Sequence, residues 1–156
     1  MKRVLLFALI SAAIHSGIKA QTTPSTSCMF VSTEAPVAEI RACAVQGDAR
    51  NQYNLGYIYD LGNKGVPEDD LRAVRWYLLA ANQGRADAQN NLGLMYFNGE
   101  GVSVDLVQAY MWLNLATAQD SSYQANKDLI EKSMTRQQIA EGQIMTREWL
   151  ARRPPE

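Results

Sequence analysis

The stretch Asn91-Leu92-Gly93-Leu94-Met95-Tyr96 repeats an earlier one, Asn54-Leu55-Gly56-Tyr57-Ile58-Tyr59, at a spacing of 37 residues. Matching residues on either side keep this spacing, which falls to 36 after the loop that follows each copy. The further pairs are Gly47/Gly84, Ala49/Ala86, Gln52/Gln89 and Gly62/Gly99, then Gly65/Gly101, Asp69/Asp105, Ala73/Ala109, Trp76/Trp112 and Ala80/Ala116. A fixed period of roughly 20 to 50 residues indicates a repeat architecture. The sequence therefore predicts two tandem copies of one unit, with one extra residue in the first loop.

Each unit is predicted to contain two helices. The first begins after Gly47 or Gly84, and the second begins at Asp69 or Asp105, because aspartate is a preferred N-cap residue. The repeated residues lie on one face of each helix at helical spacing, which predicts a core. This core consists of Leu55, Gly56, Tyr59, Ala73, Trp76, Ala80, Leu92, Gly93, Tyr96, Ala109, Trp112 and Ala116.

A glycine inside a helix costs about 1 kcal/mol relative to alanine, so a glycine that occurs twice needs a compensating contact. We expect the second helix of each unit to approach the first closely at this point. The expected partners are Trp76 lying over Gly56 and Trp112 lying over Gly93.

The combined pattern resembles the SEL-one-like repeat (SLR), a relative of the tetratricopeptide repeat. It reads Leu-Gly-x-x-Tyr, Gly-x-Gly-Val-x-x-Asp, then Ala-x-x-Trp-x-x-x-Ala-Ala-x-x-Gly. The match is specific from Ala81 to Ala116 and close from Ala44 to Gly84. The resemblance implies an all-α fold, an α/α solenoid of antiparallel helix pairs in a tetratricopeptide-like right-handed superhelix. It also implies a non-enzymatic scaffold that binds other proteins on a concave face.

Residues 1–20 are predicted to be a signal peptide, because a basic start and an apolar run precede a small-residue cleavage site at Ala20. The alternative is an uncleaved membrane anchor, although the apolar run is short for a span of about 20 residues. Cleavage would remove the only histidine, His15, and would leave 12 basic and 16 acidic residues. The expected location is periplasmic or secreted, with no membrane span in the mature chain.

The remaining chain divides by composition and by its match to the repeat. Residues 21–33, rich in Ser, Thr and Pro, are predicted to form a flexible leader. The solenoid is predicted to cover 34–152, and 153–156 are a tail. Its parts are an N-terminal capping helix at 34–47, repeat one at 48–84, repeat two at 85–120, and a degenerate repeat with a C-terminal capping helix at 121–152. Atypical terminal units of this kind are expected in solenoids.

The two cysteines, Cys28 in the leader and Cys43 in the capping helix, are predicted to form a disulfide. An exported chain with two cysteines favours this pairing. The alternative for Cys43 is a small buried residue, because it stands at the position of Ala80 and Ala116.

The sequence offers little catalytic chemistry. It contains no Gly-x-Ser-x-Gly elbow and no phosphate-binding Gly-x-x-x-x-Gly-Lys-Ser/Thr loop. Cys/His zinc sites lack ligands after residue 20, and the acidic run Glu68-Asp69-Asp70 is better explained as a helix start than as a cation site. No basic stripe points to nucleic acid. We therefore expect no catalytic residue, no cofactor, no metal and no nucleic-acid partner.

By analogy with tetratricopeptide repeats, the first helix of each unit presents its remaining side chains to a partner. These side chains are Arg50, Tyr53, Tyr57 and Asp60 in repeat one, and Asp87, Asn90, Leu94 and Phe97 in repeat two. Tyr53 and Tyr57 are one helical turn apart and are predicted to form an aromatic ridge. The alternative is that some of these residues pack between repeats.

The predicted function is a monomeric protein-binding scaffold of the bacterial envelope or secreted fraction, which takes a peptide or one partner helix on its concave face. Two alternatives stay open. One is an enzyme related to lactams or peptidoglycan, as suggested for cysteine-rich SLR relatives. The other is a structural subunit of an envelope complex.

Overall fold

The computed structural model describes Cys28 and residues 31–152, and these residues form an all-α protein. The predicted signal peptide, most of the predicted leader and the whole predicted tail lie outside the described residues. The helices, in chain order, are α1 (Val37–Val45), α2 (Ala49–Leu61), α3 (Asp70–Asn82), α4 (Ala86–Asn98), α5 (Leu106–Gln119), a 3₁₀ turn (Ser121–Tyr123), α6 (Gln124–Glu131) and α7 (Arg136–Ala151).

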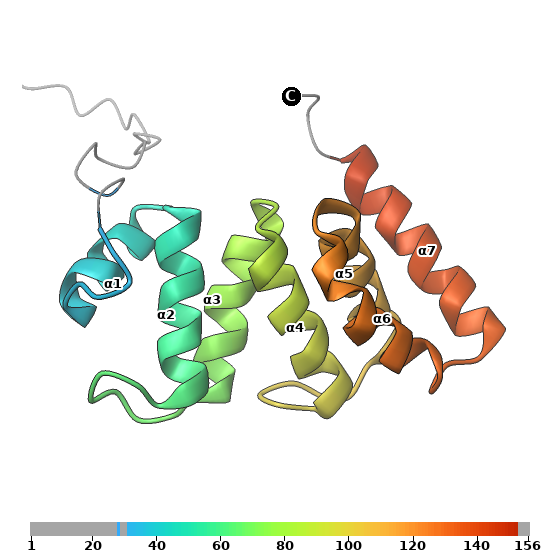
Figure 1. The fold of residues 1–156 in the computed structure, drawn as a ribbon, viewed down its shortest axis with the longest axis horizontal. Coiled ribbons are helices and arrows are strands. Elements are labelled where there is room, and N and C mark those ends of the chain that lie inside the picture. Colours follow the sequence, from blue (N-terminus) through green and yellow to red (C-terminus); the bar gives the residue numbers. More distant parts are fainter. Residues whose placement is uncertain (1–27, 29–30, 153–156) are drawn as a thin grey trace, which may run out of the picture.

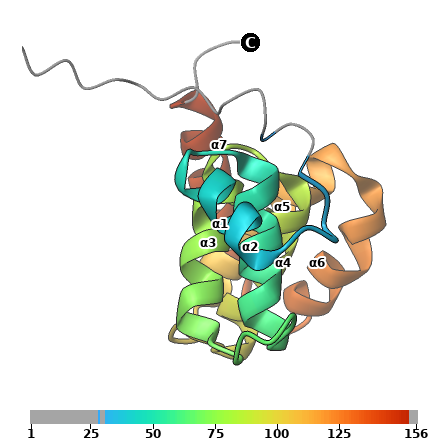
Figure 2. The same cartoon turned by 90° about the vertical axis from the view of Figure 1, so that its left-hand side faces the viewer.

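The helices follow one another in a row from α1 to α7 (Figure 1). Helices α2 and α3 form the first pair and α4 and α5 the second, and α3 contacts α4 across the boundary between the repeats. Seen from the end of the row, α6 lies on the side opposite to α3 and α7 (Figure 2). This arrangement confirms the predicted helical-repeat solenoid. The first helices of the units, α2, α4 and α6, are called A helices below.

Side chains cap the starts of four helices, and two of them, Asp69 and Asp105, are the N-caps that the repeat pattern predicted. Asp48, Asp69 and Asp105 each accept a backbone N–H from the first turn of the helix that follows them. Helix α7 begins with a complete capping box, in which Thr135 and Gln138 bind each other's backbone N–H groups. These side chains replace the hydrogen bonds that the first turn of a helix cannot make within itself.

The two repeated helix glycines do mark a close approach, as predicted. A Cβ atom on Gly56 would lie 2.6 Å from the Tyr77 ring, and one on Gly93 would lie 2.8 Å from the Leu113 side chain. The expected partners were wrong, since Tyr77 and Leu113 fill these places instead of Trp76 and Trp112. One residue turns the side-chain direction by about 100° around a helix.

That turn directs each tryptophan away from the glycine of its own pair. Trp112 is buried where α5 meets α7, and its ring makes an edge-to-face contact with Trp149 at 6.1 Å between centroids. Trp76 is partly buried at the border of the core. Tyr77 and Leu113 are the side chains that pack against the two glycines.

A repeated glutamine pair joins successive units. Gln52 Nε2 donates to the carbonyl of Ala44 at the end of α1, at 3.1 Å, and Gln83 Nε2 donates to Gln52 Oε1 at 2.6 Å. Gln89 and Gln119 reproduce both bonds one unit later, at 3.1 and 2.8 Å. Each pair therefore satisfies a carbonyl at the end of the preceding helix. The repeat pattern pairs Gln52 with Gln89, but it does not indicate that these glutamines link each unit to the preceding helix.

Candidate binding face

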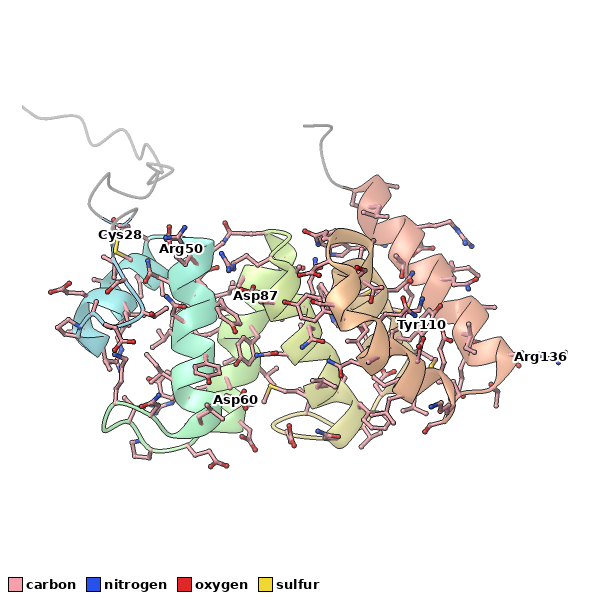
Figure 3. All side chains as sticks on the ribbon, viewed as in Figure 1. Cys28, Arg50, Asp60, Asp87, Tyr110 and Arg136 are labelled. Atoms are coloured by element: carbon pink, nitrogen blue, oxygen red, sulfur yellow. A yellow bond between two sulfur atoms is a disulfide. The ribbon has the colours of Figure 1, made fainter. Side chains whose placement is uncertain are left out.

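The A helices share one surface, called the A-helix face here, which consists of the exposed side of α2 and α4 between the turn at residues 32–35 and α6. Arg50, Asp60 and Asp87 are labelled along it in Figure 3. Tyr57 is 41% exposed on this face, whereas Tyr53 is partly buried. Their rings stack with centroids 6.3 Å apart, which confirms the predicted ridge.

Two charged side chains of repeat two, Arg85 and Asp87, lie against the ridge. The Arg85 guanidinium lies 5.4 Å from the centroid of the Tyr53 ring, and both Asp87 carboxylate oxygens accept hydrogen bonds from Arg85. Burial raises the pKa of the Tyr53 hydroxyl, and the nearby Asp87 carboxylate raises it further. Tyr53 is therefore a fixed, neutral support, and Tyr57 is the member of the ridge that is most open to a partner.

A partly buried chain of hydrogen bonds connects the two repeats at this face. The Tyr77 hydroxyl donates to Asp60 Oδ2 at 3.0 Å and accepts from Asn91 Nδ2 at 3.0 Å. Burial raises the pKa of Tyr77 strongly. Burial also raises the pKa of Asp60, and the hydrogen bond from Tyr77 works against this rise. Asp60 is thus a partner of Tyr77 as well as a residue of the face.

Repeat two contributes less to the face than predicted, because α6 covers part of it. Asn90 is only 6% exposed, and its Oδ1 accepts a 2.7 Å hydrogen bond from Asn126 of α6, so Asn90 is not available to a partner. Phe97 packs against the buried cluster that contains Ile130 of α6. Asp87, Leu94 and Phe97 are each partly exposed, so Asn90 is the buried one among the four predicted residues of this repeat.

A cleft of about 450 Å³ lies beside the tyrosine ridge, on its N-terminal side. One wall is the turn at residues 32–35, the floor is α2, and the end is the loop after α2. The lining residues are Thr33, Glu34, Tyr53, Asn54, Tyr57, Ile58, Asn63 and Lys64. The repeat pattern does not indicate this cleft, although it places Tyr53 and Tyr57 among the candidate binding residues.

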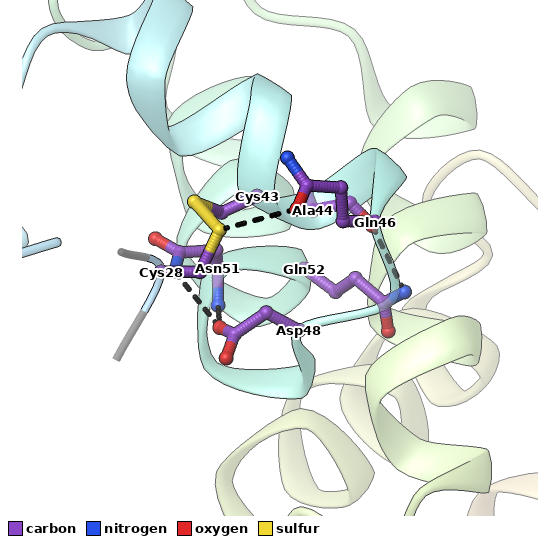
Figure 4. Close-up of a disulfide and its surroundings, with 7 residues drawn as sticks. All are labelled: Cys28, Cys43, Ala44, Gln46, Asp48, Asn51 and Gln52. Carbon is purple, nitrogen blue, oxygen red and sulfur yellow. Dashed lines mark hydrogen bonds between the residues drawn. A yellow bond between two sulfur atoms is a disulfide. The ribbon is translucent and has the colours of Figure 1, made fainter. Parts of the chain in front are cut away.

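The turn that walls the cleft is fixed at two points. Cys28 forms a disulfide with Cys43 of α1, and both residues are buried (Figure 4). The second point is Lys64, whose Nζ donates to the Ala35 carbonyl at 3.4 Å and lies 4.0 Å from the Glu34 carboxylate. The disulfide and this lysine together keep the segment alongside α2.

In the part of the chain that the structure describes, no group of three or more His, Cys, Asp or Glu side chains is arranged to hold a metal ion. None of the helices in residues 31–152 combines the length and the apolar character that crossing a membrane requires.

Comparison with known proteins identifies the family to which this helical repeat belongs. The Sel1 repeat family model matches residues 52–84 and 86–121. A solved Sel1 repeat protein from Oxalobacter formigenes is 34% identical, with a TM-score of 0.56, over 59% of this chain and 69% of that one. The chain belongs to the Sel1-repeat family.

The Sel1-repeat assignment extends to a second solved structure. This is c5321, a protective antigen present in uropathogenic Escherichia coli strains that displays an SLR fold. It is 33% identical, with a TM-score of 0.70, over 74% of this chain and 25% of that one.

Curated relatives are much longer than this Sel1-repeat protein. The Arabidopsis thaliana protein HRD3A, an ERAD-associated E3 ubiquitin-protein ligase component, is 34% identical over 58 residues, which is 37% of this chain and 9% of that one. The first relatives found are matched over only 9 to 12% of their own length. Their similarity therefore concerns the repeat and not the whole protein.

Proposed function

We propose that this Sel1-repeat protein is a non-enzymatic scaffold that binds another protein on its A-helix face. The observation that carries the proposal is the ridge formed by Tyr53 and Tyr57. A stacked tyrosine pair gives a large contact area with few rotamers to lose, and tyrosine is among the residues that dominate binding energy at interfaces. Because α2 and α4 offer a face only two helices wide, the ligand is a peptide or a single partner helix.

We also propose that the protein works as a monomer in the bacterial envelope or the secreted fraction. The Cys28–Cys43 disulfide supports this location, because disulfides persist in oxidising compartments and are rare in the cytosol. The amino-terminal apolar run supports it as well. HRD3A, described as a component of a ligase, supports an assembly role for the repeat.

The proposal predicts that Tyr57→Ser strongly reduces capture of the protein partner. Tyr57 is exposed, so this change leaves the fold intact, but it removes the accessible half of the ridge. Leu79→Ser is the matched control, since Leu79 is 47% exposed on α3, away from the A-helix face. Purified wild type and both variants serve as baits for an envelope extract, and captured proteins are quantified by mass spectrometry.

We expect wild type and Leu79→Ser to capture the same protein and Tyr57→Ser to capture at least about 10-fold less of it, as truncation of an interface tyrosine typically does. Equal capture by Tyr57→Ser would show that the partner binds elsewhere. Loss only with Leu79→Ser would place the binding surface on the opposite side of the solenoid.

A further inference from the structure

Asn54 lines the cleft beside the tyrosine ridge and carries an unused hydrogen-bond donor. The residue is 6% exposed, and its Nδ2 atom is buried without a hydrogen-bond partner. Buried polar groups in proteins are nearly always paired, because an unpaired one loses its bonds to water and gains nothing in return. An unpaired donor in the floor of a cleft therefore points to an acceptor that arrives from outside.

The equivalent residue of repeat two shows that this donor is not required by the fold. Asn91 stands 37 residues after Asn54, and its Nδ2 donates to the Tyr77 hydroxyl at 3.0 Å. The same position of the repeat is thus structural in α4 and unpaired in α2. Because repeat one has no counterpart of the Tyr77 bond for Asn54, the asparagine there is free to serve a ligand.

The one-residue difference between the loops builds the end of this cleft. Repeat one has Gly62-Asn63-Lys64-Gly65 where repeat two has only Gly99-Glu100-Gly101. Asn63 and Lys64 line the cleft, and Lys64 is the single non-glycine residue with positive φ (54°) in the described part of the chain. This backbone conformation is uncommon for a residue with a side chain. The longer loop of repeat one therefore supplies a lining residue for which the shorter loop of repeat two has no counterpart.

The charges at the cleft favour an uncharged acceptor. Lys64, the cation among the lining residues, already contacts the Glu34 carboxylate and the Ala35 carbonyl. A ligand carboxylate would have to compete with Glu34 for this lysine. A backbone carbonyl needs only a neutral donor, and the Asn54 amide supplies one. The adjacent Tyr57 ring gives an apolar surface for the neighbouring side chain of the ligand.

We propose that this cleft binds an internal segment of an extended peptide, with Asn54 Nδ2 donating to one of its backbone carbonyls and Tyr57 packing against the adjacent side chain. This inference rests on the proposed scaffold function and specifies its ligand. It assigns Asn54 to binding and Asn91 to stability, although the two residues are equivalent by sequence.

The first test separates the two asparagines by replacing each with leucine, which is of similar size and has no donor. Asn54→Leu is expected to keep or raise the melting temperature, because it removes a donor that nothing pairs. Asn91→Leu is expected to lower the melting temperature by a few degrees, because it breaks the bond to Tyr77. A larger loss of stability in Asn54→Leu than in Asn91→Leu would overturn the assignment.

The second test measures binding directly. Twelve-residue peptides are selected from a random display library on the wild-type protein, and the best binder is resynthesised with a single ester in place of each amide in turn. An ester carbonyl accepts hydrogen bonds more weakly than an amide carbonyl. Fluorescence anisotropy then gives the dissociation constant of each peptide for wild type, Asn54→Leu and Asn91→Leu.

We expect one ester position to weaken binding to wild type and Asn91→Leu by about 10-fold and to have no effect on binding to Asn54→Leu. If every ester affects wild type and Asn54→Leu equally, Asn54 does not hold a carbonyl and the proposed cleft ligand is wrong, whereas the scaffold function stands. If no peptide is selected while the Tyr57-dependent capture succeeds, the cleft assignment again fails alone. If both fail, the scaffold function fails with it.

Discussion

Tyr77→Ala is expected to lower the free energy of unfolding by about 4 kcal/mol, in the range typical of large aromatic residues replaced by alanine. Tyr77 is fully buried, and its ring fills the surface of Gly56 between α2 and α3. Its hydroxyl also pairs Asp60 and Asn91, which would lose that partner. Urea denaturation followed by circular dichroism at 222 nm measures the loss.

A second substitution tests whether Gly56 and Tyr77 depend on each other. Gly56→Ala alone is expected to cost about 1 to 2 kcal/mol, because its Cβ would overlap a ring that two hydrogen bonds hold in place. In the Tyr77→Ala background the space is open, and the same change should gain up to about 1 kcal/mol from helix propensity. Additive effects of the two substitutions would contradict the proposed contact.

Removing the disulfide is expected to cost about 3 kcal/mol, the loop-closure value for a loop of about 15 residues. The variant Cys28→Ser/Cys43→Ala places alanine where the later units have Ala80 and Ala116, so the core position stays filled. The loss arises because the unlinked unfolded chain gains entropy. Urea denaturation of the variant and of wild type, each under oxidising conditions, measures the difference.

Hydrogen exchange supplies the local part of this test. Residues 31–35 are held to α1 and α2 by the disulfide and by Lys64. Their amides should exchange faster in the double variant, whereas those of α4 and α5 should change only with global stability. An unchanged urea midpoint together with unchanged exchange at 31–35 would show that the disulfide does not hold this segment.

Local sequence patterns predicted the architecture because each feature occurs in both repeats. The helix starts at Asp69 and Asp105 and the close approach at Gly56 and Gly93 could all be read from spacing. The error at Trp76 and Trp112 has a physical source. Both residues lie on the buried side of their helix, and the sequence does not say which neighbour a buried side chain meets.

The binding face was harder to predict because it depends on contacts between units. Asn90 and Phe97 were assigned by their place in the repeat, but α6 buries Asn90, and Phe97 packs partly against the cluster that contains Ile130 of α6. The unpaired amide of Asn54 could not be read from a pattern in which Asn54 and Asn91 are identical. Only the different surroundings, Tyr77 beside one and a cleft beside the other, distinguish them. The extra loop residue is a signal in the sequence that the units differ here, and so is Ile40, which stands 37 residues before Tyr77.

The most direct test of the proposed scaffold is photo-crosslinking from the A-helix face. A benzoylphenylalanine is placed at position 57 in one protein and at position 79, on the opposite side, in another. Each protein is expressed in cells, irradiated and analysed by mass spectrometry. The proposed function predicts one protein partner crosslinked through position 57 and none through position 79. Crosslinks through position 79 alone, or the same adducts from both positions, would contradict binding at the A-helix face.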